Sequence, residues 1–132
     1  MTTRDLNDNV DAAQSLVPAA RTNGTLNGAT VDLRGYDSAM IVVSFGAYTD
    51  GAHTPSVQYS DDGTNFTNAA AADLNGSFTA VSSGAGANTM QRAGFIGGRR
   101  YVRAVMTVSG ATSGALSEAL VLRGKAHRSP LA

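Results

Sequence analysis

The sequence predicts an all-β domain, a β-sandwich or jelly-roll-like fold of seven to nine short antiparallel strands with a polar N-terminal arm. Apolar and polar residues alternate at a two-residue period in several segments, and clusters of turn-forming residues separate those segments. The chain also contains 15 glycines, which suit many tight turns. The clearest segment is 101–108, where a single face carries Val102, Ala104, Met106 and Val108.

Residues 28–124 are expected to form the sandwich, after an arm at 1–27 and before a C-terminal tail at 125–132. The run 39–45 is apolar and rich in β-branched residues, which is typical of a buried strand. Two glycine turns predict hairpins, Asp61-Asp62-Gly63 and Gly97-Gly98. The expected strands are, in order, 29–33, 39–45, a segment around Val57 and Tyr59, a return strand from Phe66, 78–81, 89–96, 100–108 and 116–123.

The expected core follows from the inward positions of these strands. On the last strand Leu120 and Leu122 share one face, which we assign as the inward face. The predicted core residues are Val31, Leu33, Ile41, Val43, Val57, Tyr59, Val102, Ala104, Met106, Leu120 and Leu122.

The N-terminal arm has too few large apolar residues to form a core of its own. An extended arm and a short helix ending at Pro18 fit the sequence equally well, and a disordered terminus is the alternative to both. An ordered arm must lay its apolar residues on its own domain, a sister subunit or another protein. The interface candidates of the arm are therefore Leu6, Val10, Leu16 and Val17.

Composition limits the partners. The 132 residues carry a formal net charge of zero, with three Arg and nine Asp in residues 1–75 against seven basic residues and one Glu in residues 76–132. Such asymmetry favours association between subunits, unless the two halves interleave in space and cancel. The basic residues form no compact patch interleaved with aromatics, so we expect no nucleic-acid binding. No apolar run is long enough to cross a membrane.

No recognisable catalytic apparatus is present, and we expect that the protein is not an enzyme. The chain has no cysteine and only two histidines, His53 and His127, whereas a zinc site needs three or four ligands. Asp61, Asp62 and Asn65 crowd one turn in a way that suits calcium, but an Asp-Gly hairpin uses the same residues. We therefore expect no metal and no cofactor.

Basic and aromatic residues at the start of the clearest strand are the second group of interface candidates. Arg and Tyr are enriched at protein contacts, and an outward Arg lying over a neighbouring Tyr is equally typical of a solvated sheet face. The candidates are Arg99, Arg100, Tyr101 and Arg103.

Three segments, VDLRGYDS at 31–38, SDDGTNF at 60–66 and GFIGGRRYVR at 94–103, resemble a family of small head-region proteins of tailed phages and prophages. The resemblance covers roughly residues 12–125 in the order and spacing of turns and strands. It implies a virion structural protein, a head decoration (cement) protein that binds the major capsid protein on the outer capsid surface. It also implies a homotrimer, made in the host cytoplasm.

Two alternatives stay open from the same residues. The 60–66 hairpin also resembles the Ser-x-Asp-Gly-x-x-aromatic hairpin of jelly-roll sugar-binding modules, which would make the protein a carbohydrate- or receptor-binding spike. The low aromatic content, 6% with no tryptophan, counts against that reading. A head–tail joining protein belongs to the same structural class as a decoration protein.

Overall fold

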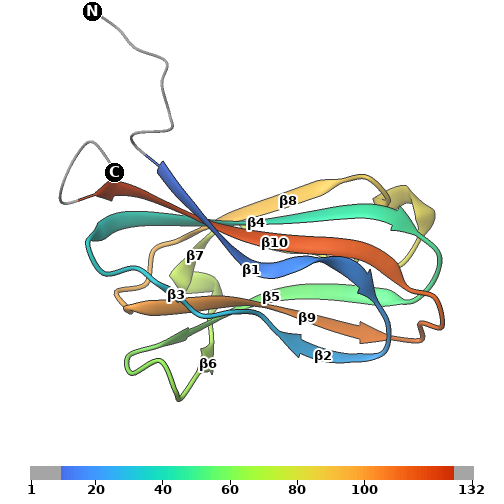
Figure 1. Ribbon diagram of the computed structural model, residues 1–132, viewed down its shortest axis with the longest axis horizontal. Helices are drawn as coiled ribbons and strands as arrows, with labels where there is room; N and C mark the ends of the chain where they lie inside the picture. Colours follow the sequence, from blue (N-terminus) through green and yellow to red (C-terminus); the bar gives the residue numbers. More distant parts are fainter. Residues whose placement is uncertain (1–9, 127–132) are drawn as a thin grey trace, which may run out of the picture.

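A computed structural model describes residues 10–126, which fold into two five-stranded sheets packed face to face (Figure 1). The first sheet contains, in spatial order, β1 (Val10–Arg21), β10 (Ala115–Ala126), β4 (Tyr36–Tyr48), β8 (Met90–Phe95) and β7 (Leu74–Asn75). The second contains β2 (Gly24–Asn27), β9 (Tyr101–Ser109), β5 (Ala52–Ser60) and β6 (Thr67–Asn68), with β3 (Val31–Asp32) also paired to β9.

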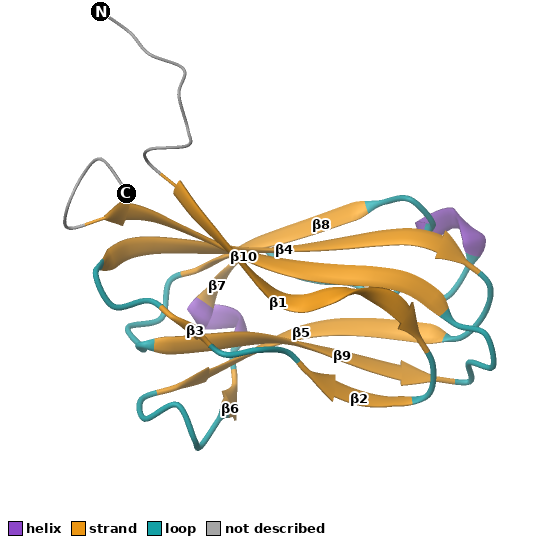
Figure 2. Cartoon of the chain, viewed as in Figure 1, coloured by secondary structure: helices purple, strands orange, loops and turns teal. Residues whose placement is uncertain are grey.

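The helical structure in this part of the chain is limited to two short 3-10 turns, η1 (Ala71–Asp73) and η2 (Gly84–Gly86) (Figure 2). No helix among the described residues has the length and apolar character needed to cross a membrane.

The connections between the sheets follow a jelly roll. The orders β1-β10-β4-β8 and β2-β9-β5-β6 bring the first and last strands of the chain side by side, and most connections cross from one sheet to the other. The predicted all-β sandwich is therefore confirmed. Ten strands are present in the described residues, more than the seven to nine expected, because β1 and β2 lie in the expected arm and the two-residue β7 leaves little signal in a sequence. The strand predicted at 78–81 was wrong, since this segment forms only an isolated bridge between Val81 and His53.

The core lies between the sheets, and most of its members match the prediction. Val31, Ile41, Val43, Val57, Val102, Ala104 and Met106 are all buried, and Leu33 and Tyr59 pack against them. The inward face predicted for β9 is confirmed, since Val108 is buried as well.

The predicted inward face of β10 was wrong. Ala119 and Val121 are fully buried, whereas Leu120 and Leu122 are half-buried on the opposite face. The run from 119 to 122 is apolar at every position, so alternation cannot decide its orientation. Pairing decides it, because Val121 lies opposite the inward Ile41 of β4.

The hairpin predicted at Gly97-Gly98 was also wrong. β8 pairs with β4 and β7 in the first sheet, and β9 pairs within the second, so this segment is a corner between sheets. Neither Gly97 nor Gly98 has a positive φ. A Cβ on Gly97 would lie 2.9 Å from the Phe95 ring, so Gly97 is needed for a close approach rather than for a turn.

The other predicted hairpin is confirmed. β5 and β6 pair in antiparallel register across the loop 61–66, and Gly63 has a φ of +77°. The Asp62 carboxylate accepts hydrogen bonds from the Thr64 and Asn65 backbone N–H groups and from the Ser60 hydroxyl.

The expected boundary at residue 27 needs correction, because the sandwich begins within the expected arm. β1 pairs with β10 from Val10 to Arg21, and β2 pairs with β9. β1 has two register shifts, on either side of Leu16, and Pro18 lies within the second. At the other terminus β10 extends to Ala126, inside the expected tail, and the rest of that tail lies outside the described residues.

Candidate functional site

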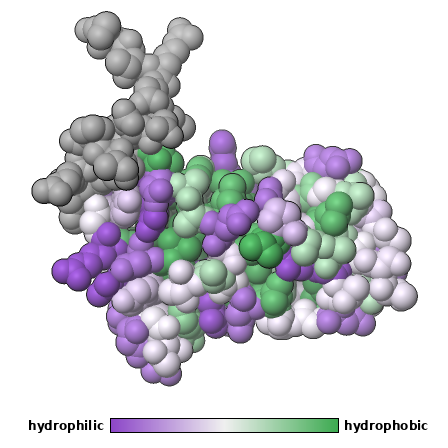
Figure 3. Space-filling model, in the orientation of Figure 1, coloured by the Kyte–Doolittle hydropathy of each residue, from purple (hydrophilic) through white to green (hydrophobic). Residues whose placement is uncertain are grey.

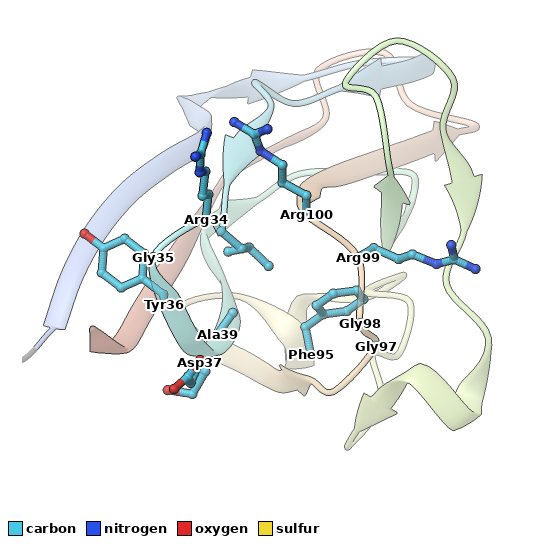
Figure 4. A pocket seen from close by; sticks show the side chains of 12 residues that line it. Arg34, Gly35, Tyr36, Asp37, Ala39, Phe95, Gly97, Gly98, Arg99 and Arg100 are labelled. Atoms are coloured by element: carbon cyan, nitrogen blue, oxygen red, sulfur yellow. The ribbon is translucent and has the colours of Figure 1, made fainter. Parts of the chain in front are cut away.

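A hollow of about 550 Å³ opens at one end of the sandwich, between the β3–β4 turn and the β8–β9 corner (Figure 4). Leu33, Ala39 and Phe95 line it with apolar surface, and the side chains of Arg34 and Arg100 extend together at one side. The hollow combines an apolar lining with guanidinium groups, which suits a partner segment that carries both apolar and acidic groups.

Asp32 holds Arg100 in place at this end. The Arg100 Nε and Nη2 atoms donate to the two carboxylate oxygens of Asp32 at 3.0 and 2.9 Å. The Arg100 guanidinium lowers the pKa of Asp32 from its ordinary value, and the Asp32 carboxylate raises the pKa of Arg100. Arg100 also lies over the Tyr101 ring, 4.8 Å from its centroid, so its position is set from two sides.

A second arginine joins four elements next to this pair. Arg123 of β10 donates to the Asp32 backbone carbonyl at 2.8 Å and forms an ion pair with Asp11 of β1. Its guanidinium lies 4.7 Å from the Tyr36 ring centroid, and burial lowers its pKa. Arg123 therefore ties β1, β3, β4 and β10 together where the termini leave the sheet.

The remaining basic candidates are engaged within the chain. Arg99 forms an exposed ion pair with Asp61 at 2.7 Å. Arg103 donates two hydrogen bonds to Gln58 and lies over the Phe66 ring at 3.8 Å. Tyr101 was the ring expected beneath Arg103, but the Tyr101 ring lies beneath Arg100, and Arg103 lies over Phe66 instead.

Arg34 differs from these arginines. Its backbone N–H donates to Asp32, but its guanidinium has no hydrogen bond, ion pair or ring contact with any described residue. It is the cation at the hollow that is available to a partner.

The candidates of the expected arm lie in different environments. Leu16 is 2% exposed and belongs to the core of its own domain, and Val17 is 58% exposed. Val10 is half-buried beside Met40 and Leu122 in a second, smaller hollow at the same end of the molecule. Leu6 lies outside the described residues.

The residues considered for metal binding or histidine chemistry lie apart. His53 is fully buried, with its Nε2 atom 2.9 Å from the Asp50 carbonyl oxygen, and His127 lies outside the described residues. The oxygens of Asp62 already bind the hairpin's own N–H groups, which lower its pKa strongly. Within residues 10–126, no three potential ligands gather at one point.

Sequence analysis did not single out Arg34, Asp32, Asp11 or Arg123. Arg34 and Asp32 lie in the 31–38 segment that carries the resemblance, so a signal for them was present. Asp11 and Arg123 are distant in sequence and meet only because β1 and β10 pair.

No family model matches this chain, and no curated protein matches it. Among solved structures, the chain is similar to one described as "Structure of infectious bursal disease virus Gx strain", with a TM-score of 0.44 and 13% identity. The match covers 86% of this chain and 32% of that one, so this chain spans about a third of its length.

Proposed function

We propose that this chain is a virion structural protein of tailed phages or prophages. It decorates the outer surface of the head, where it binds the major capsid protein and stabilises the shell. It does so as a homotrimer, without catalytic activity, after synthesis in the host cytoplasm. The resemblance of segments 31–38, 60–66 and 94–103 to the head-region family motivates this proposal.

The jelly-roll strand order supports a role in recognition. This architecture occurs in viral capsid proteins and in lectins, and both present loops and faces of a rigid sandwich to a partner. Fold alone does not assign function, so the argument depends on the site.

The end of the sandwich with the hollow is the proposed contact with the shell. The hollow offers apolar surface and the free guanidinium of Arg34. Val10 lies at this end because it pairs with Gly124, which in turn pairs with Ser38 of the hollow's lining. Val10, the first described residue, therefore lies beside the proposed contact, and the interface candidate Leu6 lies outside the described residues.

Binding to undecorated shells tests the proposal. We expect the protein to co-sediment with shells in hundreds of copies, because each repeat of the shell offers the same site. Arg34→Glu is expected to weaken binding by about tenfold or more, since it reverses the free charge at the contact. Thr107→Glu, on the outer face of the second sheet, is the matched control and is expected to bind like the wild type.

Three results would contradict the proposal: no binding to shells, a dozen copies or fewer on purified virions, or full binding by Arg34→Glu. A low copy number would instead indicate a head–tail joining or spike protein. Deletion of residues 2–9 tests the arm without removing any described residue, and we expect weaker binding with the sandwich still folded.

The carbohydrate-binding alternative finds little support in the hairpin that suggested it. A sugar platform needs an open aromatic face, and the guanidinium of Arg103 covers one face of Phe66 at 3.8 Å.

A further inference from the structure

The outer faces of the two sheets differ in chemistry. The second sheet presents mainly polar side chains: Thr25, Asn27, Thr54, Ser56, Gln58, Arg103 and Thr107. The first sheet presents six apolar residues, which we call the outer apolar face. Met40 and Val42 of β4 lie beside Leu122 and Leu120 of β10, and Met90 of β8 and Leu116 of β10 lie beyond Ser44 and Glu118 on the same face. Figure 3 shows green hydrophobic atoms interspersed with white and purple ones on the side of the sandwich that is turned to the viewer.

Such a face is unusual for an isolated antiparallel sandwich, in which the outward side of a sheet is normally polar. Met90 is 68% exposed and Leu116 46% exposed, whereas Met40, Leu120 and Leu122 are half-buried and Val42 is buried, so part of this apolar surface is open to solvent. Contiguous exposed apolar surface on a soluble protein marks a contact with another molecule.

Two charges of opposite sign lie on the same face. Of the charged residues whose side chains the structure describes, only Arg34, Arg92 and Glu118 have a charged group without a hydrogen bond, ion pair or ring contact. Arg92 is on β8 and Glu118 on β10, and both point outward, since their neighbours Ala93 and Ala119 are buried. Two of the three unpartnered charges thus flank the outer apolar face.

The register sets the separation of these two charges. Glu118 lies opposite Ser44 of β4, and Arg92 lies opposite Val42 of the same strand. They are two strands apart and two residues apart along the sheet, so their Cα atoms are about 12 Å apart. At this separation Glu118 and Arg92 do not form an ion pair within one chain. The midpoint of the line between them falls between Val42 and Ser44.

We propose that the outer apolar face binds the same face of a second copy of this chain through a two-fold axis that passes near Val42 and Ser44. The axis lies in the plane between the outer apolar faces of the two copies and is perpendicular to the line from Glu118 to Arg92. Rotation about this axis places each Glu118 against the Arg92 of the other copy. The apolar residues then pack between two reciprocal ion pairs, as in an isologous interface.

The charges favour a second copy over an unrelated partner. When an acidic and a basic residue lie on opposite sides of a two-fold axis, the rotation brings the acidic residue of each copy to the basic residue of the other. An acidic partner would satisfy only Arg92, and a basic partner only Glu118. A purely apolar partner would leave both charges unpaired beside the contact, which is unfavourable.

This contact differs from the proposed trimer, and the argument for it does not depend on the function. A two-fold contact can join two monomers or two trimers. On a shell, neighbouring three-fold positions are related by local two-fold axes, so the same contact would connect adjacent trimers.

Sedimentation of the isolated protein over a range of concentrations, without shells, tests the proposal. We expect the wild type to reach an even number of chains, a dimer or a hexamer. Arg92→Glu and Glu118→Arg are each expected to halve that mass and to raise the dissociation constant about tenfold or more. Each substitution places two like charges together at both ion-pair positions of the interface. The double variant Arg92→Glu/Glu118→Arg restores opposite charges and is expected to recover the wild-type mass.

Arg34→Glu is the matched control, because it reverses the third unpartnered charge, at the hollow, and changes no residue of the outer apolar face. It is expected to keep the wild-type mass while losing shell binding. The two-fold contact and the shell contact can therefore be contradicted independently. A wild type that remains a monomer or trimer at high concentration would overturn the inference. So would single variants of unchanged mass, or a double variant that does not recover. Circular dichroism confirms that each variant is folded.

Discussion

The carboxylate of Asp32 binds two nitrogens of Arg100 across 68 residues of chain, at 2.9 and 3.0 Å. Both side chains are more than two-fifths exposed, so solvent screens the pair and its contribution to stability is small. Its effect on structure is larger, because it fixes the position of the β8–β9 corner against β3.

Replacing Arg100 is therefore expected to change the titration of Asp32 more than the stability of the fold. In Arg100→Gln the pKa of Asp32 should rise toward its ordinary value, because the strongest cause of its lowering is removed. Carboxyl carbon shifts measured by NMR against pH check this. Arg99→Gln, which breaks the pair with Asp61 and the ring contact with Tyr59, should leave the pKa of Asp32 unchanged.

Acid is expected to destabilise the protein through three aspartates. Asp50, Asp62 and Asp32 all have lowered pKa values, the first two because backbone N–H groups donate to their carboxylates. The unfolded chain then binds more protons, so their stabilisation is complete above about pH 4–5 and is lost as the pH falls through the lowered values.

Urea unfolding at a series of pH values measures this. Asp50→Asn should have a shallower acid limb than the wild type, since its side chain has no proton to take up. An identical slope in the two proteins would show that Asp50 does not contribute.

Gly114 is expected to tolerate no side chain. A Cβ there would lie 1.7 Å from the Arg21 backbone oxygen, and the φ is +78°. Gly114→Ala must therefore displace β1 from β10, with a loss of several kcal/mol, on the order of the total stability of a small domain. Gly110→Ala is the control, because its φ is +66° but nothing lies within 4 Å; it should cost about 1–2 kcal/mol. Equal melting temperatures for the two variants would contradict this account.

Ile41 is 0% exposed at the centre of β4, and Ile41→Asp is expected to prevent folding. An unpaired buried charge costs several kcal/mol, comparable with the whole free energy of unfolding. Ser44→Asp, on the outward side of the same strand, should give a soluble folded protein. Solubility and circular dichroism distinguish the two, and a folded Ile41→Asp variant would refute the core assignment.

His53 is expected to be replaceable by an aromatic ring but not by a small residue. Its Nε2 atom contacts the Asp50 carbonyl oxygen, its Nδ1 atom has no partner, and its ring packs edge-on against Phe45 and Tyr48. His53→Phe loses one hydrogen bond but also removes an unsatisfied buried nitrogen, so its stability should lie within about 1 kcal/mol of wild type. His53→Ala should lose about 3–5 kcal/mol through the cavity it leaves, as measured by chemical unfolding.

The sequence predicted strand orientation and turns correctly where the local pattern and the tertiary structure agree. Segment 101–108 has a single alternating pattern, and Gly63 has the positive φ that its hairpin requires. The pattern failed where two faces are equally apolar, as at Leu120 and Val121. It also failed at Gly97, where glycine is needed because a Cβ would lie too close to the ring of Phe95. Only the folded chain shows this contact.

The site was less predictable than the fold. Arg100 was identified because it stands in a run of basic and aromatic residues, but its partner Asp32 was not, since a pair 68 residues apart leaves no local signal. The outer apolar face became visible only when the register placed Leu120 and Leu122 beside Met40 and Val42.

The β1 edge of the first sheet limits how copies of this chain can join. The longest edge strand, β1, is interrupted by two register shifts and by Pro18, which has no N–H to donate. A strand arriving at β1 therefore finds no regular row of partners, which disfavours fibre growth through strands added at that edge. On that side of the sandwich, contacts between copies are left to side chains.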